Sequence, residues 1–298
     1  MMKIFFKNKR WFLYALYCMA LTAVLLYFYF PSDVLTNYIQ TRANNLNTNL
    51  SFSVERAKPW FPLGLRLWQT EVSTRKRPGV KLFKADSTII RPDILSYLKG
   101  QGKYRFKSLA YGGDIKGFVF IKKNGVSRPF DTKIKFENIK VGAHKNLKEL
   151  LGRHIDGVLD GYVNYRGSGK GIMDGAGEAN LELSDGSLGL ALPVLSIESI
   201  DLDNVIIDMH FKDRKVDFKR FELKGPLFKG RITGSIRINK KFSRSVIDLK
   251  GTVEIFSGFL KNNNAGLEII GLIKNKLNKG KISFAIYGTI GAPKYKLI

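Results

Sequence analysis

A glycine-rich segment around Lys170 is the first candidate for chemistry in this sequence. Gly167-Ser-Gly-Lys-Gly171 has the glycines and the lysine with which nucleotide-binding loops hold phosphate groups. Such a loop also needs a glycine five residues before Gly169, where this chain has Asn164. It further needs Ser or Thr directly after the lysine, and this chain has glycine there. The segment therefore predicts a flexible turn and not a phosphate site.

Histidine and cysteine are too few and too scattered to indicate a metal centre. Metal-binding histidines commonly recur at short, regular spacings on one element, and His144, His154 and His210 have no such spacing. The single cysteine, Cys18, has no partner for a disulfide or a thiolate metal site. It lies within an apolar segment, where cysteine usually acts as a small buried hydrophobe. No metal ligand is predicted.

Two aspartates are the remaining candidates for acid–base catalysis. Asp201 and Asp203 would face the same side of a strand, as paired catalytic acids can. They flank Leu202 directly before the apolar run Val205-Ile-Ile207, which favours a solvated strand edge. The Gly-x-Ser-x-Gly motif of a hydrolase nucleophile does not occur. With no catalytic, cofactor-binding or metal residue indicated, we expect a protein that is not an enzyme.

Composition favours a β-rich protein that meets anionic partners. The chain has 298 residues, of which 44% are hydrophobic, so it can bury a sizeable core. Its 29 glycines and 21 phenylalanines suit many strands and tight turns. The net charge is +25, from 50 basic and 25 acidic residues. This charge would attract anionic lipid headgroups, lipopolysaccharide or nucleic acid.

The N-terminal region is typical of a membrane anchor. Residues Trp11 to Phe30 form a run of 20 residues without a charge, and about 20 helical residues cross a hydrocarbon core of roughly 30 Å. Aromatic residues gather at both ends of the run, as at membrane interfaces. The residues that we assign to this anchor are Trp11, Tyr14, Leu21 and Phe30. The basic residues that precede the run, Lys3, Lys7, Lys9 and Arg10, predict a cytoplasmic N-terminus.

This orientation predicts three regions. Residues 1–10 are a cytoplasmic basic segment, residues 11–30 a transmembrane helix in the inner membrane, and residues 31–298 a periplasmic domain. A cleaved signal peptide is the alternative, but no small-x-small site follows the run and the run is longer than a usual signal core. Because the basic domain then lies away from cytoplasmic DNA and RNA, nucleic acid is not an expected partner.

The exported part alternates with the period of strands. Ile247, Leu249, Gly251, Val253 and Ile255 would share one face, and the same alternation recurs from Ile282 to Ile290. Clean alternation predicts antiparallel strands with one dry face. We therefore expect a mainly β fold, with an N-terminal transmembrane helix followed by a curved, largely antiparallel sheet. A few short helices are expected near residues 32–44, 92–99, 144–151 and 266–278.

A glycine pattern recurs three times on the expected strands. Two glycines four residues apart are separated and followed by alternating apolar residues. Both glycines of each copy would lie on the apolar face, where glycine permits a sharp bend or the close approach of another chain or ligand. We expect these to be structural glycines, namely Gly113, Gly117, Gly157, Gly161, Gly230 and Gly234.

Further short motifs follow one another along nearly the whole chain. After the basic start and the apolar run come Pro62-Leu-Gly-Leu65, Leu95-Ser-Tyr-Leu-Lys-Gly100, Ala110-Tyr-Gly-Gly113 with Gly117, the glycine-rich stretch 157–177, Gly225-Pro-Leu-Phe-Lys-Gly230 with Gly234, and Tyr287-Gly-Thr-Ile-Gly-Ala-Pro293. In this order the chain resembles the type II secretion system protein N family and, more distantly, the AsmA-like proteins.

The resemblance implies two functions. The first is an accessory or structural subunit of the type II secretion system, fixed to the inner membrane and acting through periplasmic contacts with other subunits. It implies no catalytic residues and no cofactor. The alternative is an AsmA-like lipid-handling protein, in which the dry face is a groove for acyl chains and basic rims meet anionic lipid. In the simplest structure, that face instead packs against a second sheet and the short helices.

Overall fold

The computed structural model describes most of the chain. The described residues are 9–46, 49–75, 77–99, 101–121, 129–144, 146–151, 153–168, 171–194, 197–226, 228–256 and 281–298.

Strands make up most of this structure, and the helices are few. The helices are α1 (Lys9–Phe28), α2 (Ser32–Leu46), α3 (Ile94–Leu98) and α4 (Leu147–Leu151), with 3-10 turns η1 (Val141–Ala143) and η2 (Phe242–Arg244). The strands are β1 (Leu50–Ser53), β2 (Arg56–Pro59), β3 (Leu65–Thr74), β4 (Arg77–Pro92), β5 (Gly102–Ala110), β6 (Gly113–Ile121), β7 (Phe130–Lys140), β8 (Ile155–Ser168), β9 (Gly171–Val194), β10 (Ile197–Lys212), β11 (Lys215–Lys224), β12 (Phe228–Arg237), β13 (Val246–Ile255), β14 (Lys281–Thr289) and β15 (Ala292–Leu297).

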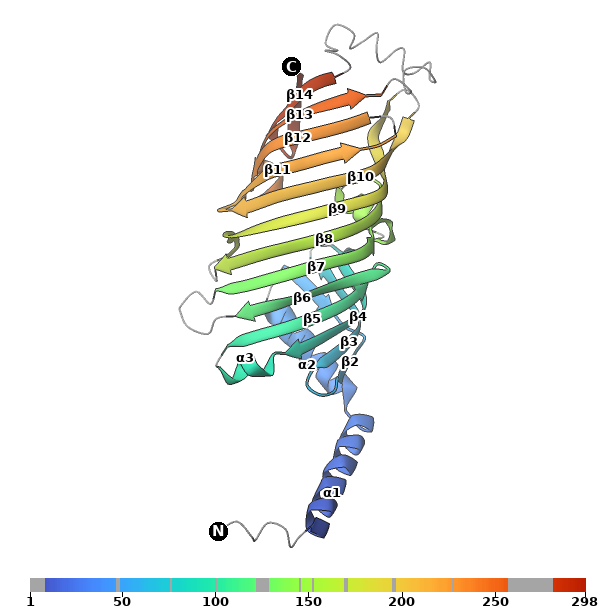
Figure 1. Cartoon of the computed structure of the whole chain (residues 1–298), viewed down its shortest axis with the longest axis vertical. Coiled ribbons are helices and arrows are strands. Elements are labelled where there is room, and N and C mark those ends of the chain that lie inside the picture. Colours follow the sequence, from blue (N-terminus) through green and yellow to red (C-terminus); the bar gives the residue numbers. More distant parts are fainter. Residues whose placement is uncertain are drawn as a thin grey trace.

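All fifteen strands belong to one sheet. The order of the strands in space follows their order in the chain from β3 to β15, with β1 and β2 both paired to β3. Every pairing is antiparallel, so the sheet is a long series of hairpins. Figure 1 shows the sheet as a tall, curved ladder, with α1 leading away from its lower end. The prediction of a mainly β, antiparallel fold with a few short helices is confirmed.

The hydrophobic core is concentrated at the N-terminal end of the sheet. There α2 packs Leu35 and Ile39 against the buried cluster Val54, Ala57 and Leu67. A second cluster lies on β4 to β7 and contains Ala85, Ala110, Ile115 and Ile139. Of the expected cover over the dry face, the second sheet is wrong for the described part, because its strands form a single sheet. A short helix does cover the first strands, where α2 packs against the cluster of Leu67 and Ile90.

Polar side chains of α2 cover the first edge of the sheet. The Asn44 side chain accepts a hydrogen bond from the Phe52 backbone N–H (2.8 Å) and donates one to its carbonyl (3.1 Å). The Thr36 hydroxyl accepts a hydrogen bond from the Ala57 N–H at 2.9 Å. An uncovered strand edge presents unpaired donors and acceptors to other chains. The contacts from α2 occupy some of those groups on β1 and β2.

The predicted short helices are largely confirmed. The segment near 32–44 is α2, and the segment near 92–99 is α3, which begins at Ile94 after the cap Asp93. Asp93 accepts a hydrogen bond from the Ser96 N–H, whereas Pro92 ends β4. The helix expected over 144–151 is shorter, since α4 begins at Leu147. The segment 266–278 lies outside the described residues.

The N-terminal run is helical over Lys9–Phe28, and Phe30 follows the end of α1. Counting only the residues that the structure describes, none of the helices is both long and apolar enough to cross a membrane. The expected transmembrane helix over residues 11–30 therefore gains no support from the structure.

Candidate functional site

One face of the sheet carries an unbroken line of apolar residues. Residues directly opposite each other on paired strands point to the same face of a sheet. Followed from strand to strand, such pairs connect β3 to β15 without one charged residue. We call this line the apolar row: Leu65, Ile90, Phe106, Gly117, Ile134, Val163, Ala179, Met209, Phe218, Gly234, Leu249, Ile286 and Tyr295.

A second line runs beside the apolar row, two residues away on most strands. It is again made of apolar residues and glycines, and it extends from β6 to β15. Together the two lines give the sheet a broad dry face over its whole length. The members are Ile115, Phe136, Gly161, Leu181, Ile207, Phe221, Ile232, Gly251, Phe284 and Leu297.

The dry face is only half-buried beyond the N-terminal core. Val163, Met209 and Phe218 each keep part of their surface exposed. Within the described part, Ser245 is the largest side chain that is completely buried. A sheet face that packs against a second layer buries most of its large apolar side chains. Here Ala179 and Leu249 are buried, while most other members of the apolar row are only partly buried. Extended apolar surfaces that stay partly exposed to solvent often mark binding sites.

Aromatic rings lie against cross-strand glycines on the dry face. Phe106 is paired with Gly117, and a Cβ at Gly117 would lie 2.8 Å from the Phe106 ring. The rings of Phe130 and Phe284 likewise occupy the space that side chains would need at their partners Gly167 and Gly251. Glycine allows the ring to lie close to the neighbouring backbone. At each of these pairs the side chains rise less far above the sheet than two bulky side chains would.

Five of the six predicted glycines have a steric reason to be glycine. Gly157, Gly161 and Gly234 have φ values of +132°, +142° and +124°, which residues with a side chain rarely adopt. At Gly113 and Gly117 a Cβ would collide with backbone carbonyl oxygens of β7. Glycine at these positions thus allows the backbone of the neighbouring strand to come close.

Gly230 differs from the other five glycines of the pattern. A Cβ there would lie 3.4 Å from the Leu223 side chain and 3.7 Å from the Val253 side chain. Both are ordinary van der Waals distances, so Gly230 has space for a side chain.

Charged residues lie on the opposite face, where they form cross-strand ion pairs. Glu137 accepts hydrogen bonds from Lys116 and Lys135, and these lower the pKa of its carboxyl to about 2. Arg220 and Arg231 do the same for the pKa of Glu222, also to about 2. Both acids are therefore ionised at any physiological pH and are unsuited to donate a proton. In the described part, the ion pairs are thus on the face opposite the apolar row.

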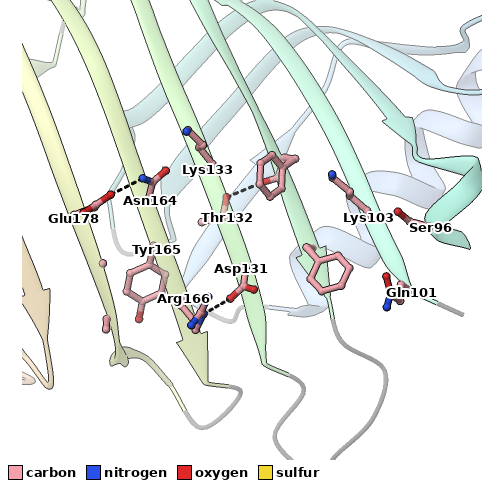
Figure 2. Close-up of a pocket in the computed structure, with 14 residues that line it drawn as sticks. Ser96, Gln101, Lys103, Asp131, Thr132, Lys133, Asn164, Tyr165, Arg166 and Glu178 are labelled. Atoms are coloured by element: carbon pink, nitrogen blue, oxygen red, sulfur yellow. Dashed lines mark hydrogen bonds and ion pairs between the residues drawn. The ribbon is translucent and has the colours of Figure 1, made fainter. Parts of the chain in front are cut away.

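An open hollow of about 650 Å³ lies on this charged face (Figure 2). The Lys103 ammonium lies 4.8 Å above the centre of the Phe118 ring, and the Arg166 guanidinium is 2.9 Å from the Asp131 carboxylate. Figure 2 shows that these groups are spread along the strands and do not converge on one point. The hollow therefore resembles a solvated strand surface more than a catalytic pocket.

The residues considered for chemistry lie apart. His210 is on β10, while His144 and His154 precede α4 and β8. No group of three or more metal-ligating side chains occurs among the described residues. Asp201 and Asp203 are both exposed on β10, as predicted for a solvated strand. Ser168 ends β8 and pairs with Gly171 at the start of β9, while residues 169–170 of the predicted turn lie outside the described residues.

The predicted anchor residues remain uncovered in the structure. Trp11, Tyr14 and Leu21 are exposed on α1, with exposed fractions of 74%, 67% and 45%. Phe30 is half-buried where the chain enters α2.

The chain matches no protein-family model, no curated protein and no solved structure. The geometry described above is therefore the basis for a functional proposal, beside the resemblance noted in the sequence.

Sequence reasoning missed the main feature of the site. It found the alternation and the glycines, but not the continuity of the apolar row. The sequence contains part of this information, because every strand from β3 to β15 has an apolar residue or a glycine at its position in the apolar row. Only the pairing register shows that these positions line up across the sheet.

Proposed function

We propose that this chain is a non-enzymatic lipid-handling protein of the cell envelope, which binds acyl chains along the dry face of its sheet. The apolar row is the observation that carries this proposal. It crosses thirteen strands, and at about 4.8 Å between strands it is about 58 Å long. Because a whole hydrocarbon core is roughly 30 Å thick, the row is long enough for several acyl chains placed end to end.

The energetics suit exchange of lipid with a membrane. Each methylene removed from water contributes about 0.8 kcal/mol, so an acyl chain does not leave a bilayer for an aqueous surface. A dry face offers surroundings similar to the bilayer interior, and the transfer then costs little in either direction. The charged face does not compete for the chain, because burying its ions would be costly.

A photocrosslinking experiment tests acyl-chain binding. A photoreactive phenylalanine analogue is placed at Met209, in the apolar row, or at Asp208, the next residue on β10. Neighbouring strand residues point to opposite faces, so Asp208 is a matched control. We expect irradiated cells to yield phospholipid adducts at Met209 and none at Asp208. Equal adducts at both positions, or protein adducts alone at Met209, would overturn the proposal.

We further propose that residues 11–30 anchor the chain in the inner membrane, with the N-terminus in the cytoplasm and the domain in the periplasm. The support is the run of 20 uncharged residues, the basic residues before it, and the exposed aromatic and aliphatic side chains of α1.

A second candidate function is that of a type II secretion subunit, and β15 favours it. All six residues of β15 are exposed, and in the described part this strand pairs only with β14. Whereas α2 binds the opposite edge of the sheet, the outer edge of β15 is open in the described part. An exposed edge can accept a strand from another protein. We propose such a strand from another secretion subunit as the partner.

A further inference from the structure

Six exposed apolar side chains occupy one end of the sheet. Phe61 and Leu63 lie in the turn between β2 and β3, and Phe61 is 85% exposed. The others are on α3, between β4 and β5, where Leu95 and Leu98 are 73% and 77% exposed. We call this set the apolar edge: Phe61, Leu63, Ile94, Leu95, Tyr97 and Leu98.

The pairing of the strands brings the turn and α3 to the same end of the sheet. The turn before β3 closes with a hydrogen bond from the Trp60 N–H to the Gly64 carbonyl, 2.9 Å. A Cβ at Gly64 would lie 3.0 Å from the Arg91 side chain, near the end of β4. Only two residues separate Arg91 from the start of α3. The two parts of the apolar edge thus lie at the same end of the sheet, beside the start of β3 and the end of β4.

Hydrogen bonds fix the orientation of α3. The Asp93 carboxylate accepts the Ser96 N–H at 3.2 Å and an Arg105 guanidinium at 2.9 Å. The Ser96 N–H is the main cause that lowers the pKa of Asp93, so the cap stays charged at neutral pH. The Asp93 N–H also donates to the Lys103 carbonyl at 2.8 Å. A helix of only five residues, held this way, presents its apolar side chains outward and buries none of them.

The surroundings of the apolar edge are strongly basic. Between Arg56 and Arg66 and between Arg91 and Lys107 the sequence has eight basic residues and one acid, Asp93. That acid is already bound to Arg105. Apolar side chains within a field of cations suit the interface of an anionic lipid bilayer, which takes apolar groups below the headgroups and attracts cations above them.

The position of α1 favours contact between the apolar edge and a lipid bilayer. Ala57 of β2 bonds to Thr36 in the second turn of α2, and α1 directly precedes α2. In Figure 1, α3 and β2 lie at the end of the sheet from which α1 extends. A bilayer that holds α1 would therefore meet this end of the domain first.

We propose that the apolar edge inserts into the interface of an anionic lipid bilayer and holds the end of the sheet on the membrane. This docking is separate from acyl-chain binding by the apolar row, because it uses different residues on turns and on α3. A protein partner fits the surface less well, since the apolar side chains of α3 are all exposed and none of them lines the hollow of Figure 2. Docked in this way, the end of the sheet whose dry face α2 covers lies next to the membrane surface.

A fluorescence experiment on the full chain tests the docking. In a Cys18→Ser background, an environment-sensitive dye is attached at Leu95→Cys, and the chain is reconstituted into vesicles. The vesicles are made with phosphatidylglycerol or with phosphatidylcholine alone. Lys250→Cys, on the charged face of β13, is the matched surface control, and Tyr14→Cys reports insertion of α1. We expect the Leu95 dye to shift to the blue and to be quenched by lipid-borne quenchers in anionic vesicles, while the Lys250 dye stays in water.

Further variants and conditions complete the test. Raising the salt from 0.1 M to 1 M shortens the Debye length from about 10 Å to about 3 Å, and should reduce quenching at Leu95. Replacing Leu95→Ser together with Leu98→Ser should abolish quenching of a dye at Phe61→Cys, with an unchanged circular dichroism spectrum. A Leu95 dye that is as accessible to water as the Lys250 dye, while the Tyr14 dye is buried, would overturn docking but not the anchor. Protein crosslinks at Leu95 in native membranes, without lipid crosslinks, would also overturn it.

Discussion

At the scale of single residues, glycine determines how closely the strands approach. The sequence shows where glycine recurs, and five of the six predicted positions have a steric need for it. It does not show which glycines are essential, because φ and cross-strand contacts depend on the pairing register. Nor does it show that Phe106 lies over Gly117, since the two residues meet only when β5 and β6 pair. The exception, Gly230, provides an internal comparison.

Alanine substitutions separate the essential glycines from the others. Gly161→Ala and Gly234→Ala each force a side chain into positive φ and against a backbone carbonyl, so each should lower the free energy of unfolding by about 1–3 kcal/mol. Gly230→Ala should leave it unchanged or raise it by up to about 1 kcal/mol, because alanine restricts the unfolded chain. The measurement is thermal unfolding of the full chain in detergent, with bound lipid determined in parallel. If all three variants unfold at the same temperature, the steric explanation is wrong. Loss of bound lipid without loss of stability would show that the lack of a side chain at these positions serves lipid binding rather than strand packing.

At the scale of elements, alternation predicts the strands but not what covers them. The runs from Ile247 to Ile255 and from Ile282 to Ile290 do form neighbouring antiparallel strands. A period of two indicates one dry face, whether that face meets a second sheet, a helix or a ligand. The single layer could therefore not be predicted. The exposure of α3 could not be predicted for the same reason. A capping residue or a proline indicates where a helix begins but not whether the helix packs against the sheet.

The open edge of β15 gives an element-scale prediction for the secretion hypothesis. The Ile298 N–H points inward to the Ser283 carbonyl, and N–H groups alternate along a strand, so the Tyr295 N–H should face outward. Tyr295→Pro would remove that donor and leave the pairing with β14 intact. We expect crosslinks to secretion subunits in membranes to be lost in Tyr295→Pro and kept in Tyr295→Ala, which retains the N–H. Equal crosslinking in the two variants would contradict strand addition.

At the scale of the whole molecule, apolar and charged residues are separated between the two faces of the sheet, and the proposed membrane contacts lie at one of its ends. Apolar residues follow one face of the sheet and ion pairs the other, while the apolar edge and α1 share one end. The net charge of +25 indicates anionic partners but does not show where they bind. Only the fold shows that basic residues surround an exposed apolar surface near α1. The function therefore depends more on the arrangement in space than on any motif in the sequence.

Topology is the whole-molecule property that is simplest to test. A reporter that is active only in the periplasm, fused after Ile298, should be active, because the basic segment before Trp11 stays in the cytoplasm. A cytoplasm-specific reporter at the same position should be inactive and serves as the control. The mature chain should retain residues 1–30. Detection of a mature chain that begins near Pro31 would reject the anchor, and an inactive periplasmic reporter would reject the orientation.

The strand order has a consequence for how such a protein can change in length. Among the described residues, each strand from β4 onward pairs only with its neighbours in the chain. One hairpin can therefore be added or removed there without changing any other pairing. Each added hairpin would lengthen the dry face by about 10 Å, the width of two strands. The length of the sheet can therefore change in steps of one hairpin. This length can be changed by gene duplication or deletion while the end next to α1 stays the same.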